Sequence, residues 1–317
     1  MEENVTLILG LYAAGLAAAG LLYAYRLGRA GEKRLCALLA VIFGVPLAYA
    51  GAKIFFLLHN AGMDIRNWSA ETVFSLRWDE FSFTGGCLGF VLGVRIAAAV
   101  LRVNGKKALD LFAVPGCLLI VFARMAEAGM ESVGQGDMPA FLPEFFPFAL
   151  KDEWSGEAVL AVFTLEALAA LLCAVWLEVS GRKQPVREKQ FEKACLVLCS
   201  IQLFLEMTVN DSIPFIISFI HLEQVLCAVI LLVLIARLTV RTKKAGPAVL
   251  AVLMIGLNAL TQFVQDKPYL FPIPENADIG TAAMIAFALT SAGLIAAGLR
   301  AEGNDQKKEL SLSSKGS

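Results

Sequence analysis

The sequence predicts an all-α protein, a polytopic integral membrane helical bundle with about nine transmembrane helices, its N-terminus outside and its C-terminus cytoplasmic. Three observations lead to this fold class. Of the 317 residues, 58% are hydrophobic and only 17% are charged, whereas charged residues make up about a quarter of a soluble domain. The apolar residues gather in segments close to the length of about 20 residues that a spanning helix needs. The basic residues concentrate in alternate connections between those segments.

Nine segments have the length and hydropathy expected of a spanning helix. In order, they cover residues 5–26, 35–58, 86–101, 108–126, 157–178, 191–209, 220–236, 247–264 and 280–299. The tail that follows the last segment, residues 303–317, is polar and contains few hydrophobic residues, so it is predicted to be disordered.

Basic residues predict the orientation, because Lys and Arg favour the cytoplasmic connections of a membrane protein. Twenty of the 27 Lys and Arg residues follow the first, third, fifth, seventh and ninth segments. The opposite connections are acidic or mixed, including the two long ones at 60–85 and 128–156. This pattern places the N-terminus outside and the C-terminus in the cytoplasm.

Composition argues against several classes of partner. The net charge of −1 gives no reason to expect a nucleic-acid partner. The seven cysteines are scattered through apolar segments without a Cys-x-x-Cys pair, and the chain has only two histidines. We therefore expect neither a metal centre nor another cofactor.

The second long outer connection contains an aromatic run, Phe141–Phe148. One interpretation is an aromatic belt that rests at the outer membrane interface, where such rings are enriched. The other is a lid or lateral gate over a cavity that lipid can enter.

Charged residues inside apolar segments are functional candidates, because burying them in a membrane is costly. Arg124 lies near the outer end of the fourth segment, and a guanidinium suits the oxygens of a phosphate. Glu127 follows three residues later, on the same face of a helix. The alternative is an internal ion pair of Arg124 with Glu127 or Glu206 that only neutralises charge.

Three further ionisable residues lie within the segments. Lys53 is in the middle of the second one, a position that favours an interior partner or a phosphate. Glu166 and Glu206 are in the fifth and sixth. Each of the two could accept a proton, or could neutralise Arg124 or Lys53.

A glycine repeat opens the third segment, with Gly85-Gly86 followed by Gly89 and Gly93. Small residues at a spacing of four favour close packing of membrane helices. Free backbone N–H groups at the start of a helix also attract phosphate.

Several short motifs occur in a fixed order along residues 1–240. They are Gly51-Ala-Lys53-Ile-Phe-Phe56, Phe83-Thr84-Gly85-Gly86-Cys-Leu-Gly89, Asp110-Leu-Phe-Ala-Val-Pro115, Arg124-Met-Ala-Glu127, Glu131-Ser-Val-Gly134, Leu165-Glu166-Ala-Leu168, and Glu206 with His221-Leu-Glu-Gln224. In order and spacing they resemble the signatures of the prolipoprotein diacylglyceryl transferase family. The resemblance implies a seven-helix transferase-like core at 1–240, two additional helices at 241–302 and the tail at 303–317.

Members of that family are multi-pass proteins of the bacterial plasma (inner) membrane. They transfer the diacylglyceryl group of phosphatidylglycerol to the cysteine thiol of a lipobox in a secreted prolipoprotein, and release glycerol phosphate. The resemblance therefore implies phosphatidylglycerol or another anionic phospholipid and a prolipoprotein precursor as partners. It implies catalytic roles for Arg124, Glu127, Glu131 and Glu206, and phospholipid binding by Arg124, Lys53, Thr84, Gly85, Gly86 and Gly134.

Three departures from the family pattern leave the function open. Thr84 stands where the family has a histidine, Glu127 where it has an asparagine, and Gln202 where it has an arginine. The first hypothesis is a transferase in which Glu206 or Glu127 serves as the base. The second is a catalytically degenerate paralogue that binds phospholipid or prolipoprotein without transfer. The third is a transporter or flippase, suggested by the charged residues within the segments.

Overall fold

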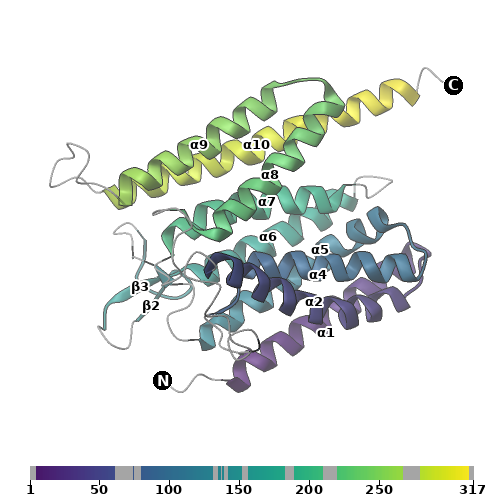
Figure 1. The fold of residues 1–317 in the computed structure, drawn as a ribbon, viewed down its shortest axis with the longest axis horizontal. Coiled ribbons are helices and arrows are strands. Elements are labelled where there is room, and N and C mark those ends of the chain that lie inside the picture. Colours follow the sequence, from purple (N-terminus) through teal and green to yellow (C-terminus); the bar gives the residue numbers. More distant parts are fainter. Residues whose placement is uncertain are drawn as a thin grey trace. The chain divides into compact units, whose positions relative to one another are not determined.

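A computed structural model describes most of the chain as helices (Figure 1). The described residues are 5–60, 74, 80–130, 135–136, 138, 142–151, 156–182, 189–209, 220–266 and 279–313. Within these described residues, eight helices are long and apolar enough to cross a membrane, as in a multi-pass membrane protein. They are α1 (Val5–Arg29), α2 (Leu35–Asn60), α4 (Phe83–Val100), α5 (Gly105–Ala126), α6 (Val162–Arg182), α8 (Leu222–Thr242), α9 (Gly246–Asp266) and α10 (Ile279–Ser313).

The sixth predicted segment forms a shorter helix, α7 (Gln190–Leu205). It has 16 residues, and a single 3-10 turn, η5 (Glu206–Thr208), continues it. Each predicted segment thus contains a helix in the described part of the chain, and α7 is the one below the usual spanning length.

The last helix differs from expectation at its end. Residues 303–313, predicted to be disordered, continue α10 as far as Ser313. This stretch has no proline and contains Glu, Gln, Lys and Leu, which favour helix even where no apolar face is buried.

A small β-sheet also departs from the all-α prediction. Its strands are β1 (Gln135–Gly136), β2 (Ala149–Lys151) and β3 (Ala158–Ala161), in the order β1-β3-β2, with Ala149 opposite Leu160 in the antiparallel β2–β3 pair. β3 occupies the start of the predicted fifth helix, because a short apolar run carries no periodicity that separates strand from helix.

Phe145 and Phe146 of the aromatic run, just before β2, are 62% and 58% exposed. The choice between an aromatic belt and a lid stays a prediction.

The chain forms two compact units that interleave in sequence. The first comprises Met1–Gln135, Ala161–Ala194 and Asn210–Pro214, and the second comprises Gly136–Leu160, Cys195–Val209 and Phe215–Ser317. The functional division that the resemblance implies at residue 240 stays a prediction.

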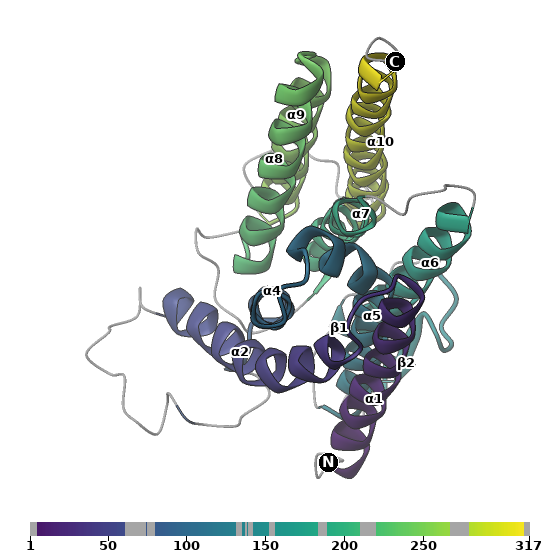
Figure 2. The ribbon, with the colours of Figure 1, turned by 90° about the vertical axis from the view of Figure 1, so that its right-hand side faces the viewer.

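In the first unit, α2 packs against α4, and α1 and α6 pack against α5 (Figure 2). The apolar core between α1, α2, α4 and α5 includes Tyr23, Phe90 and Phe112. The rings of Phe90 and Phe112 stack with centroids 5.6 Å apart, and the Tyr23 hydroxyl donates to the Ala108 carbonyl oxygen at 3.1 Å.

The glycine repeat lies in the contact between α2 and α4, and it begins inside a regular helix whose N-cap is Ser82. A Cβ atom at Gly89 would overlap the Leu47 carbonyl, and one at Gly93 would lie 2.5 Å from the backbone of Gly44. The repeat therefore allows two helix backbones to approach closely.

A polar network connects the end of α1, the end of α6 and the start of α7 in the first unit. Arg26 is 4% exposed, forms an ion pair with Glu178 at 2.7 Å and donates to Gln190 Oε1 at 2.6 Å. The Asp110 carboxylate accepts from the backbone N–H groups of Lys189 and Phe191, at the first turn of α7. The network fixes the start of α7 against the first unit.

In the second unit, α8, α9 and α10 lie side by side (Figure 1 and Figure 2). Leu231, Ile235 and Leu294 form a core with Leu196 of α7. Two buried hydrogen bonds cross this core. Asn258 Nδ2 donates to Thr290 Oγ1 at 3.3 Å, and Ser291 Oγ donates to the Ser200 carbonyl oxygen at 2.8 Å.

Candidate functional site

The principal charged cluster of the first unit surrounds Arg124, in the last turn of α5. Glu127 opens the 3-10 turn η4 (Glu127–Gly129) directly after that helix, and Glu166 lies near the start of α6. Arg124 Nη1 is 2.6 Å from Glu127 Oε1, and Arg124 Nε is 2.6 Å from Glu166 Oε2. The three residues are 7%, 6% and 6% exposed, so two buried carboxylates hold one buried guanidinium.

The guanidinium also lies against an aromatic ring at the start of α4. Arg124 Cζ is 3.5 Å from the ring centroid of Phe83, in the range of a cation–π contact. Because Phe83 is the first residue of α4, the cluster adjoins the positive end of that helix dipole. Thr84 and Gly85, predicted to bind phospholipid, follow in the same turn and are buried.

Lys53, in α2, also lies near the start of α4, where its ammonium contacts the ring of Phe81. It is 3% exposed, and its Nζ is 2.7 Å from Glu80 Oε2. The rings of Phe56 and Phe81 flank the ammonium at 5.5 and 5.0 Å. Lys53 thus has an interior partner, as its position predicted, and that partner is a glutamate that precedes α4.

Four predicted motifs therefore meet in the first unit. Lys53 comes from the motif at 51–56, Phe83 to Gly86 from the one at 83–89, Arg124 and Glu127 from the one at 124–127, and Glu166 from the one at 165–168. The backbone connects them further, since the Ser82 N–H donates to the Ala52 carbonyl oxygen at 3.1 Å. A Cβ added at Gly86 would lie 3.6 Å from Ala52 Cβ of α2, an ordinary contact distance. Glu131 and Gly134 lie outside the described residues.

Sequence reasoning missed Glu80 and Tyr12, and it gave Phe83, the first residue of the motif at 83–89, no role in the cluster. Glu80 is in a long connection that carries no distinctive pattern. Tyr12, in α1, packs against Ala126 and Met130, and its phenol interacts electrostatically with Glu127 and Arg124. Its only sequence signal is a hydroxyl within the first apolar segment.

Glu206 belongs to a different cluster, in the second unit. Gln202 Nε2 donates to Glu206 Oε2 at 3.0 Å, and His221 Nδ1 is 3.4 Å from Glu206 Oε1. His221 is the N-cap residue of α8, and its backbone N–H donates to Gln224 Oε1 at 2.9 Å. The carboxylate therefore has partners from α7 and α8.

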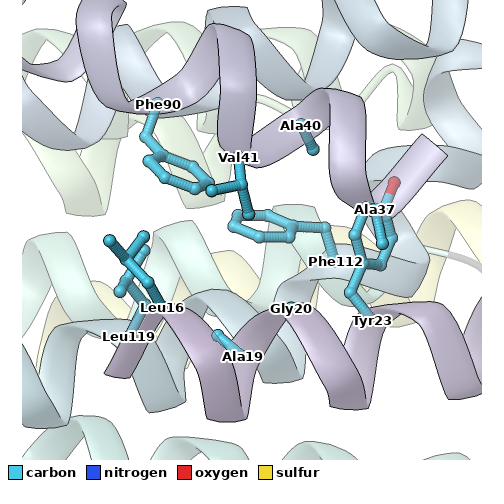
Figure 3. Close-up of a pocket in the computed structure, with 10 residues that line it drawn as sticks. All are labelled: Leu16, Ala19, Gly20, Tyr23, Ala37, Ala40, Val41, Phe90, Phe112 and Leu119. Atoms are coloured by element: carbon cyan, nitrogen blue, oxygen red, sulfur yellow. The ribbon is translucent and has the colours of Figure 1, made fainter. Parts of the chain in front are cut away.

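A small cavity lies inside the first unit, among α1, α2, α4 and α5 (Figure 3). Its volume is about 10 Å³, and its lining includes Leu16, Val41, Phe90 and Phe112. A cavity of this size holds about one water molecule. This volume is too small for a phospholipid. Tyr23 supplies the one side-chain hydroxyl of an otherwise apolar wall.

The Arg124 cluster has two chemical capacities. A guanidinium paired with carboxylates can exchange one of them for phosphate oxygens, which it also binds in a forked geometry. A carboxylate released in this way can accept a proton. Comparison of the chain with family models, curated proteins and solved structures finds no match, so these capacities are the basis for a function.

Proposed function

We propose that the chain is a diacylglyceryl transferase-like enzyme of the bacterial plasma membrane. Its donor is phosphatidylglycerol or another anionic phospholipid, and its acceptor is the lipobox cysteine thiol of a secreted prolipoprotein. The supporting observation is that Lys53, the start of α4, Arg124 with Glu127, and Glu166 pack together in one unit, although they are up to 113 positions apart in the sequence.

In the proposed reaction, Arg124 exchanges a glutamate for the phosphate of the lipid, and Lys53 adds positive charge nearby. Glu127 takes the proton of the acceptor thiol. The thiolate sulfur then forms a bond to the carbon of the diacylglyceryl unit that carries the phosphate. The bond between this carbon and the phosphate oxygen breaks. Glycerol phosphate leaves with the electron pair of that bond, and the product is a thioether. Glu131, Gly134 and Glu206 keep the catalytic and binding roles that the resemblance implies.

The same proposal includes a topology of nine membrane crossings with the N-terminus outside and the C-terminus in the cytoplasm. The distribution of Lys and Arg supports it. Under this topology the end of α5 and the start of α6 lie at the outer face, where a secreted prolipoprotein presents its thiol.

The test measures transfer of labelled diacylglyceryl from phosphatidylglycerol vesicles to a lipobox peptide by the purified full chain. Arg124→Lys keeps the charge but removes the forked donor geometry, so we expect the rate to fall by about a hundredfold. Arg95→Lys is the matched control, because Arg95 is an exposed arginine in the same unit. Equal rates for the two folded variants would contradict the proposal.

A second candidate is a paralogue that binds phospholipid or prolipoprotein without transferring the lipid. It is favoured by the ion pairs themselves, because Arg124 already contacts two carboxylates and Lys53 a third. Thr84, at the position of the family's histidine, cannot serve as a base near neutral pH.

Native mass spectrometry separates the two candidates. A non-catalytic binder retains phosphatidylglycerol in wild-type protein and yields no thioether product over long incubation. A transferase yields product in the same preparation. Loss of retained phosphatidylglycerol in Arg124→Lys, but not in Arg95→Lys, assigns the lipid to the Arg124 cluster in either case.

A further inference from the structure

The second unit contains a polar cluster around Glu206, for which the transferase proposal keeps the catalytic role that the resemblance implies but names no ligand. Glu206 of η5 accepts from Gln202 of α7 and lies 3.4 Å from His221, the N-cap residue of α8, whose backbone N–H donates to Gln224 in the first turn of that helix. His221 and Gln224 are 6% and 3% exposed. A Glu–His pair set between two amides is an expensive arrangement to bury beside membrane-length helices.

One polar group in this cluster lacks a hydrogen-bond partner among the described residues. Gln224 Oε1 accepts from the backbone N–H of His221 at 2.9 Å, which holds the amide in place. Gln224 Nε2, on the same amide, is buried and donates to no described atom. Buried amide donors are rarely left unused, so among the described residues this nitrogen is the group that a bound acceptor would satisfy.

The neighbouring carboxylate restricts what that acceptor can be. Glu206 only accepts hydrogen bonds when ionised, and each of its oxygens can accept a second one. A phosphate or carboxylate would satisfy Gln224 but be repelled by Glu206. An ammonium would satisfy Glu206 and offer Gln224 nothing. A hydroxyl group both donates and accepts, so it satisfies the two together.

We propose that Gln224, His221 and Glu206 form a binding site for the hydroxyl group of a neutral membrane lipid. The site lies where α8, a helix apolar enough to span a membrane, begins, so a hydroxyl at the lipid–water interface is at the matching depth. The lipid hydroxyl donates to the Glu206 carboxylate and accepts from Gln224 Nε2. This site is independent of the phosphate chemistry proposed for Arg124.

The test uses the full chain in phosphatidylcholine nanodiscs with added 1,2-dioleoylglycerol. Retained lipid is measured by native mass spectrometry. The matched ligand is the same lipid with its hydroxyl methylated, which can no longer donate. We expect the wild type to retain the alcohol at least about tenfold better than the ether, the affinity difference of one hydrogen bond to a charged group.

Two variants test the assignment to residues. Gln224→Glu keeps the oxygen that caps His221 but removes the N–H donor, and Glu206→Gln keeps size while removing charge; each should lower retention by about tenfold. Thr290→Val is the control, because it removes a different buried hydrogen bond of the second unit and should leave retention unchanged. Unfolding midpoints establish that each variant is folded.

Equal retention of alcohol and ether, or of alcohol by wild type and Gln224→Glu, would overturn the site. No retention of either lipid would overturn the lipid assignment, and without protection by glycerol it would also overturn the hydroxyl site and leave a water molecule as the occupant. A separate titration with glycerol identifies the source of the hydroxyl. If glycerol protects the wild type but not Gln224→Glu against unfolding while the lipid does not, the hydroxyl site stands and the lipid assignment fails. Absence of transferase activity has no bearing on any of these outcomes.

Discussion

Arg124 shows how the first unit accommodates charge at membrane depth. Its guanidinium contacts Glu127, Glu166 and the Phe83 ring, which together replace the water that it would otherwise bind. The cluster carries one more negative than positive group. In the proposed reaction, a phosphate that enters the site therefore displaces a carboxylate from Arg124, and this carboxylate becomes available as the base.

Removing this guanidinium should be strongly destabilising, because two buried carboxylates would lose their counter-charge. We expect Arg124→Ala to lower the free energy of unfolding by about 3–5 kcal/mol, measured by titration with sodium dodecyl sulfate in mixed micelles. Arg95→Ala, at an exposed position of the same unit, should change it by no more than about 0.5 kcal/mol. Similar values for the two variants would show that the Arg124 ion pairs contribute little to stability.

Partners of charged residues were only partly predictable from the sequence. The Arg124–Glu127 pair was among the alternatives because a spacing of three places both on one helical face. Glu166 could have paired with Arg124 or with Lys53, and helix packing decides that choice. Glu80, the partner of Lys53, lies in a connection without a repeating pattern, so the fold of that connection had to be known first.

At the scale of elements, glycine determines how closely α2 and α4 pack. The Cβ positions of Gly89 and Gly93 are filled by the backbone of α2, which cannot move aside as a flexible side chain could. The close approach brings Lys53 beside the start of α4. The packing of this helix pair therefore positions the site.

Alanine at Gly89 should force the two helices apart. We expect Gly89→Ala to lower the free energy of unfolding by about 1–3 kcal/mol, as overpacking does in other interiors. Gly86→Ala is the control, because its Cβ would lie 3.6 Å from Ala52 Cβ, an ordinary contact. That variant should be as stable as the wild type or more stable by up to about 1 kcal/mol. Equal losses in both would contradict the packing account.

Arg26 joins three helices of the first unit at the opposite end. Arg26→Met keeps an unbranched apolar side chain but leaves Gln190 Oε1, which is buried, without its donor. We expect a loss of about 1–3 kcal/mol in the free energy of unfolding. The control is Arg29→Met, one turn further along α1 at an exposed position, which should have almost no effect.

Helices were predicted more reliably than their ends or the short strands. Long apolar runs specify a helix because a membrane leaves the backbone no other partner. The start of α6 was placed at residue 157, within an apolar run whose first part forms β3. Strands of two to four residues depend on partners distant in sequence, which no local pattern reveals.

At the scale of the whole molecule, the number of crossings depends on α7. In the part of the chain that the structure describes, eight helices have spanning length, whereas α7 has 16 residues and gains one further turn in η5. An even number of crossings places both ends of the chain on one side of the membrane, and an odd number places them on opposite sides. The pattern of basic residues favours the odd number.

Reporter fusions decide between these topologies. A fluorescent protein that folds only in the cytoplasm should fluoresce when it is fused after Ser317. A phosphatase that is active only after export should be active when it is fused before Met1. If both ends reported from the cytoplasm, the number of crossings would be even. That result would contradict the proposed location of the Arg124 cluster at the outer face.

The most direct test of the transferase proposal is the mass of a lipobox peptide after incubation with the purified protein and phosphatidylglycerol. The account predicts that the peptide gains one diacylglyceryl group through a thioether, which hydroxylamine does not cleave. A peptide with serine in place of the lipobox cysteine should gain nothing. An unchanged peptide mass after incubation with folded, lipid-replete wild-type protein would contradict the proposal.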